Sequence, residues 1–175
     1  MVPIHMNEKQ KIEQASAEGF LELFNQRFGT DYQIIELGDA PDVRCKDSKG
    51  AELNLEVTLT EDRPRDIQVT LGRSNHRSIE ALAEHNLKVS KGKEKPQSSC
   101  LSGKVLTQMA GRIIKKLENS YGQNTALIVR DTSGVDWDWD VVIEELKEMT
   151  KSGNDRFDKG IWIMNRMKTK LYQVA

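Results

Sequence analysis

Two acidic residues, Asp42 and Glu56, stand at a spacing from which a short β-hairpin would bring their carboxylates together. The segment around them has the pattern of two strands, 42–46 and 52–59, joined by turn residues at 47–50. With the turn centred near its third residue, position 42 falls opposite position 56, whereas a two-residue turn would shift this register by one. Directly opposed side chains lie about 5 Å apart at Cβ. The sequence therefore predicts two neighbouring carboxylates.

Such a pair has a specific chemistry if it lies under a neighbouring element. The alternation of side chains along a strand places Glu56 and Thr58 on a polar face, opposite the face that carries Leu53, Leu55 and Val57. Opposed carboxylates repel each other unless a divalent cation lies between them. Mg²⁺ is typically bound by one or two carboxylates, with waters and substrate phosphate completing its shell, and it promotes phosphodiester hydrolysis. The alternative is an ordinary hairpin.

The elements around the hairpin predict an α/β fold with a mixed central β-sheet flanked by helices. Early strands follow one another and can pair antiparallel, while later strands alternate with helices, which favours parallel pairing. One domain over residues 1–175 suits this length. The expected elements are helices over 8–28, from Ser102 or Gly103 to about Tyr121, and in WDWDVVIEELKEMT, and strands over 32–37, 42–46, 52–59, 125–131 and in GIWIMNRM and KLYQVA.

The motif around the two acids resembles the core of the PD-(D/E)XK nuclease superfamily. It consists of Pro41-Asp42, thirteen intervening residues, and Glu56-Val57-Thr58. The order of elements over about 8–131 also resembles that superfamily's restriction-endonuclease-like αβββαβ core, with 132–175 as an added helix and strands. The resemblance implies metal-dependent hydrolysis of DNA with Mg²⁺ (or Mn²⁺). It implies that Asp42 and Glu56 are metal ligands and that the Val57 main-chain carbonyl is a third.

One position departs from the superfamily pattern. Thr58 occupies the place of the usual catalytic lysine and carries no positive charge. Some branches supply that lysine from a neighbouring helix, and here the segment RIIKKLENSY offers Lys116 or Lys115. The superfamily also often uses a glutamate of the first helix, for which Glu13 is the first candidate and Glu18 the second.

The charge distribution suggests an anionic partner at one face of the molecule, but it is equally compatible with solvated surface charges. Residues 1–62 carry 6 basic and 13 acidic side chains, whereas residues 63–116 carry 12 basic and 4 acidic ones. These basic groups can neutralise phosphates without reading base sequence; the alternative is that they are solvated surface charges. The candidate DNA-contacting residues are Arg63, Arg65, Arg73, Arg77, Lys91, Lys93 and Arg112.

Several other classes of protein lack support in the sequence. No apolar run is long enough to span a membrane, the start lacks a secretory signal, and Cys45 and Cys100 form no CxxC motif, so a cytoplasmic location is expected. No phosphate-binding glycine motif or GxSxG elbow occurs. His5, His76 and His85 are too scattered to suggest a ligand set.

Two hypotheses of different class therefore remain. The first is a metal-dependent DNA nuclease, for which the resemblance leaves a homodimer open because such enzymes often dimerise to cut both strands. The second is a catalytically inactive nuclease-like domain that binds nucleic acid or a protein partner. Thr58 is the residue that favours the second hypothesis.

Overall fold

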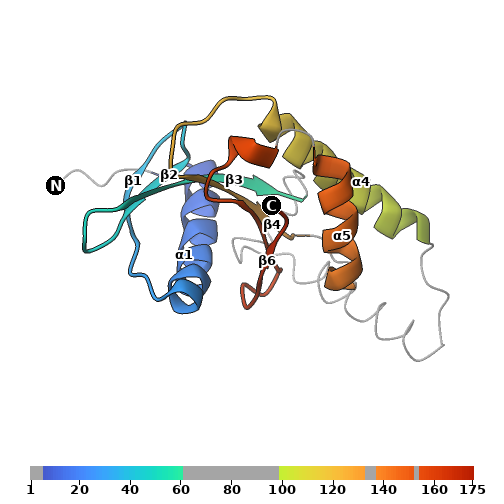
Figure 1. The fold of residues 1–175 in the computed structure, drawn as a ribbon, viewed down its shortest axis with the longest axis horizontal. Coiled ribbons are helices and arrows are strands. Elements are labelled where there is room, and N and C mark those ends of the chain that lie inside the picture. Colours follow the sequence, from blue (N-terminus) through green and yellow to red (C-terminus); the bar gives the residue numbers. More distant parts are fainter. Residues whose placement is uncertain (1–5, 61–98, 133–136, 152–153) are drawn as a thin grey trace.

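The computed structural model describes residues 6–60, 99–132, 137–151 and 154–175 (Figure 1). Its strands form one six-stranded sheet whose spatial order is the chain order, β1-β2-β3-β4-β5-β6. The elements are α1 (Glu8–Phe28), β1 (Gln33–Leu37), β2 (Val43–Lys46), β3 (Glu52–Leu59), α4 (Ser99–Leu117), β4 (Thr125–Arg130), α5 (Trp139–Thr150), a 3₁₀ turn (Asn154–Arg156), β5 (Ile161–Met164) and β6 (Leu171–Gln173).

The strand directions confirm the predicted mixed sheet. β1, β2 and β3 pair antiparallel, β3, β4 and β5 pair parallel, and β6 returns antiparallel to β5. Between β2 and β3, Val43 lies opposite Leu55 and Lys46 lies opposite Glu52. This is the register expected for the longer turn, not the one shifted by a two-residue turn.

Helix α1 covers one face of the sheet. Asn7 caps its start through reciprocal hydrogen bonds with Gln10, and Gly29 ends it in the left-handed conformation at φ 64°. Its buried side chains pack with the odd-numbered apolar residues of β2 and β3 and the even-numbered ones of β4 and β5. This core consists of Ala17, Phe20, Leu21, Val43, Cys45, Leu53, Leu55, Val57, Ala126, Ile128, Trp162 and Met164.

Helices α4 and α5 cover the opposite face, as Figure 1 shows. The odd-numbered residues of β4 and β5, which include Leu127 and Ile161, pack against both helices. Helices therefore flank both faces, as the sequence predicts. The polar face of β3, which carries Glu56 and Thr58, is turned toward α4, because Leu55 and Val57 lie in the core beneath α1.

The predicted bounds of α4 are wrong by a few residues. The helix begins at Ser99, and it ends at Leu117 and not near Tyr121. Tyr121 lies outside the helix, and its ring stacks on Phe157 at a centroid distance of 4.7 Å. Ile114 of this helix is 42% exposed and lies outside its buried stripe of Met109, Ala110, Ile113 and Leu117.

Some predictions fall on residues that the structure does not describe. These are His5, His76 and His85, and six of the candidate DNA contacts: Arg63, Arg65, Arg73, Arg77, Lys91 and Lys93. Within the ranges that are described, no helix is both long and apolar enough to cross a membrane.

Candidate metal and phosphodiester site

The two acids of the motif lie at the point where β2 begins and β3 nears its carboxyl end. Continuing the observed register by one residue sets Asp42 opposite Glu56. Asp42 Oδ2 accepts a hydrogen bond of 2.9 Å from the Val57 main-chain N–H, so the Asp42 carboxylate is fixed against β3. Both side chains are buried, with each residue only 3% exposed. The hairpin thus buries two neighbouring carboxyl groups.

Pro41 removes a main-chain hydrogen-bond donor from the pairing of β2 with β3 at this position. If the register continued, Pro41 would lie opposite Val57, and it has no N–H to donate. The N–H and C=O of one strand residue point to the same side of the strand. The Val57 N–H points toward β2 and donates to the Asp42 side chain, so the Val57 carbonyl also points toward β2. The strand pairing therefore supplies no donor to the Val57 carbonyl from this position.

Lys116 of α4 reaches the same site from the sheet face that α4 covers, opposite the face covered by α1. Its Nζ donates a 2.9 Å hydrogen bond to Glu56 Oε2. Burial raises the pKa of Glu56, and the hydrogen bond from Lys116 offsets part of that rise. Burial works to lower the pKa of Lys116, but Glu56 outweighs it and the pKa is raised. Lys116 is therefore a charged ammonium group held beside the carboxylate of β3.

Glu13 completes a group of three buried acids. It lies on the second turn of α1, is 5% exposed, and pairs through Oε1 with Lys9 Nζ at 3.1 Å. Lys9 Nζ also lies 3.6 Å from Asp42 Oδ1. Burial, followed by the negative charge of Asp42, raises the pKa of Glu13 to about 7, although Lys9 counters both effects. Glu18, the second candidate, is exposed and accepts a hydrogen bond from Gln14 instead.

Two oxygens of this group have unfilled capacity to bind a cation. Glu13 Oε2 and Glu56 Oε1 are buried and have no hydrogen-bond partner. Buried polar atoms are normally partnered, so these oxygens fit a site that accepts an additional donor or a cation. Within the described ranges, no three His, Cys, Asp or Glu side chains form a ready-made metal cage. The donor set fits an ion such as Mg²⁺, which keeps waters and binds through few carboxylates.

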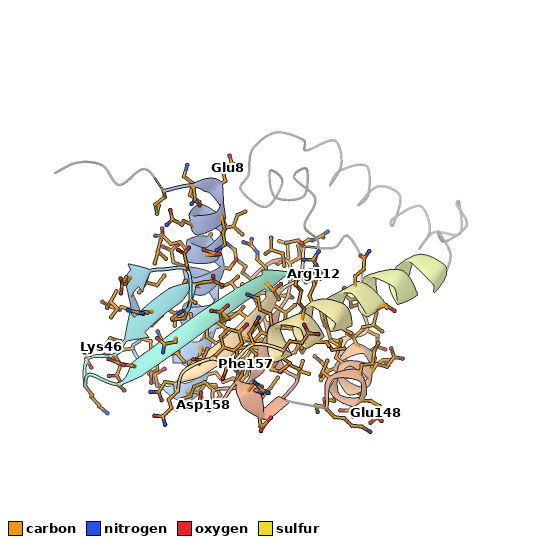
Figure 2. All side chains as sticks on the ribbon, turned by 90° about the horizontal axis from the view of Figure 1, so that it is seen from above. Glu8, Lys46, Arg112, Glu148, Phe157 and Asp158 are labelled. Carbon is orange, nitrogen blue, oxygen red and sulfur yellow. The ribbon has the colours of Figure 1, made fainter. Side chains whose placement is uncertain are left out.

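A pocket of about 480 Å³ opens beside the acids, between α1, the end of β3 and α4. Glu13 lies in its wall, whereas Asp42 and Glu56 are not among its lining residues. The opposite wall is basic and carries Arg112 and Lys115. Figure 2 shows Arg112 on α4 close to the carboxyl end of β3. The full lining is Glu8, Lys9, Ile12, Glu13, Val57, Thr58, Leu59, Arg112, Lys115, Lys116 and Asn119.

The structure thus brings together most of the described candidates. Short contacts or electrostatic interactions link the side chains of Asp42, Glu56, Glu13 and Lys116. The adjoining pocket is lined by Thr58, Lys115 and Arg112. Sequence reasoning missed Lys9. Its signal was its position four residues before Glu13 on a helix, a spacing that places two side chains side by side.

Comparison of this chain with protein-family models, curated proteins and solved structures gave no match.

Proposed function

We propose that this protein is a metal-dependent nuclease that hydrolyses phosphodiester bonds of DNA, with a restriction-endonuclease-like core and a cytoplasmic location. The observation that carries the proposal is the group of three buried acids, Asp42, Glu56 and Glu13, beside an open pocket with a basic wall. Two oxygens of this group have no partner, which is costly in a buried site unless a ligand supplies one.

Asp42 and Glu56 would hold a Mg²⁺ (or Mn²⁺) ion, with the Val57 carbonyl as a main-chain ligand. When bound, such an ion polarises the phosphate and lowers the pKa of a bound water. The chain's own residues do the remaining work. Lys116 keeps a positive charge beside Glu56, where Thr58 supplies none. Arg112 and Lys115 give the pocket wall the charge that a phosphate backbone requires.

Glu13 has the properties of a proton acceptor. In the metal-free protein, burial and the negative charge of Asp42 raise its pKa to about 7, so it holds a proton more readily than an ordinary carboxyl group. A general base is most effective when its pKa lies near the working pH. Glu13 lies in the pocket wall, so it can exchange a proton with a water held there.

The alternative is a catalytically inactive nuclease-like domain that binds nucleic acid or a protein partner. Thr58 favours it, because a threonine cannot replace the charge of the usual lysine. The ion pairs of Lys9 and Lys116 also favour it, because they already neutralise part of the acid cluster without a metal.

Cleavage of supercoiled plasmid DNA distinguishes the two functions. Wild-type protein with Mg²⁺ or Mn²⁺ is expected to convert the plasmid to nicked or linear forms. Asp42→Asn and Glu56→Gln should lower the rate at least about 100-fold, because each removes a proposed metal ligand. Glu52→Gln is the matched control, since Glu52 lies on β3 but is exposed at its other end. DNA binding without cleavage in either metal would support the inactive domain and overturn the nuclease.

A further inference from the structure

Lys9 occupies a particular position between two acids from separate elements. Its Nζ lies 3.1 Å from Glu13 Oε1 on α1 and 3.6 Å from Asp42 Oδ1 in the segment before β2. The two carboxyl groups are buried, whereas the Lys9 side chain is 61% exposed. Lys9 therefore brings a positive charge from the pocket side to groups that have little contact with water.

The two lysines of the site differ in how easily they can leave it. Lys116 is held at 2.9 Å from Glu56, and its side chain is only 27% exposed. Lys9 extends from the first turn of α1 into the open pocket, so its side chain can turn into solvent. Because the Lys9 side chain is mostly exposed, its ammonium group can return to water when it leaves the site, and an incoming cation would replace its charge beside the two buried acids.

We propose that Lys9 is a resident counter-cation, meaning that its ammonium group neutralises Glu13 and Asp42 until a divalent cation displaces it. This inference rests on the proposed metal-dependent function and adds a residue that sets the metal affinity of the site. Lys9 and the divalent ion compete for Asp42, and a positive charge left within a few ångströms also repels the incoming ion. Lys9 thereby weakens metal binding while keeping the metal-free acids together.

Manganese binding provides the direct test. Free Mn²⁺ is measured by electron paramagnetic resonance while the full-length protein is titrated at pH 8 and low salt. Lys9→Gln is expected to bind Mn²⁺ about three- to tenfold more tightly than wild type, because one competing charge is gone. Lys9→Arg keeps the charge and should keep wild-type affinity. Lys11→Gln removes a lysine two positions along the same helix, which has no ion pair with the acids, and should change affinity less than twofold.

The outcomes distinguish a failure of the counter-cation role from a failure of the proposed metal-dependent function. Equal or weaker Mn²⁺ binding by Lys9→Gln, or equal tightening by Lys11→Gln or Lys9→Arg, overturns the role of Lys9 even if the protein cleaves DNA. Tighter binding by Lys9→Gln that disappears with a second change, Asp42→Asn, supports that role even if no DNA is cleaved. Absence of Mn²⁺ binding in every variant overturns both the counter-cation and the metal-dependent function.

Discussion

Replacing Glu13 by glutamine should change how the stability of the protein depends on pH. Glutamine keeps the shape of the side chain and removes its charge. In the folded protein the pKa of Glu13 is raised from 4.5 to about 7, first by burial and then by the charge of Asp42. In the unfolded chain the carboxyl group returns to its ordinary pKa. The folded state therefore binds the proton more tightly than the unfolded state does.

The sign and size of the effect follow from this difference. A carboxyl group with a raised folded-state pKa costs no stability below about pH 4.5, and its cost grows as the pH rises through about 7. The two values differ by two to three pH units, at about 1.4 kcal/mol each, so the full cost is about 3 kcal/mol. We therefore expect Glu13→Gln to match wild type near pH 4.5 and to be up to about 3 kcal/mol more stable at pH 8.

Urea unfolding in the presence of a chelator, at intervals from pH 4.5 to 8, measures this difference. Glu22→Gln is the matched control, because it removes a carboxylate from the exposed side of the same helix. The control should differ from wild type by a nearly constant amount across the range. A Glu13→Gln curve that runs parallel to wild type, or that falls below it at high pH, would refute the reasoning.

Three further changes test the site and its support. Lys116→Met should lower the free energy of unfolding in urea by about 1–3 kcal/mol at pH 8, because it leaves buried Glu56 without its hydrogen-bond donor. The loss should be smaller at pH 5, since the raised pKa of Glu56 favours its protonated form at low pH. An equal loss at both pH values would contradict this. Gly160→Ala should lower the free energy of unfolding by more than about 1 kcal/mol, since φ is +93° and a Cβ would lie 2.8 Å from the Ala175 carbonyl oxygen; wild-type stability would count against it. Burial raises the pKa of Cys45 to about 12, so its thiol should react with a disulfide reagent much faster in urea than in the folded protein, and equal rates would argue against burial.

The hairpin could be predicted because local rules determine it. Turn residues at 47–50 and the alternation of apolar residues along β3 together give the register that sets Asp42 opposite Glu56. Both rules act over a few residues, and the large apolar side chains of β3 leave only one face for the core. The sequence therefore predicted two neighbouring carboxylates for the longer turn, whereas their burial depends on the helices that pack over them.

Lys9 could not be assigned in the same way. Its spacing to Glu13 is helical and visible in the sequence, but its approach to Asp42 depends on where α1 crosses the sheet. The large apolar residues that α1 shares with β2, β3 and β5 determine that crossing. No local pattern specifies it, so the contact emerges only from the packed structure.

Lys116 lies where the proposed nuclease needs a positive charge that Thr58 does not carry. Thr58 lies on the same face of β3 as Glu56, two residues further along the strand. The Lys116 ammonium group reaches Glu56 across sixty positions of the chain, from a helix that packs over that face. In the proposed nuclease, the covering helix would therefore supply the positive charge at the carboxylate in place of a strand neighbour.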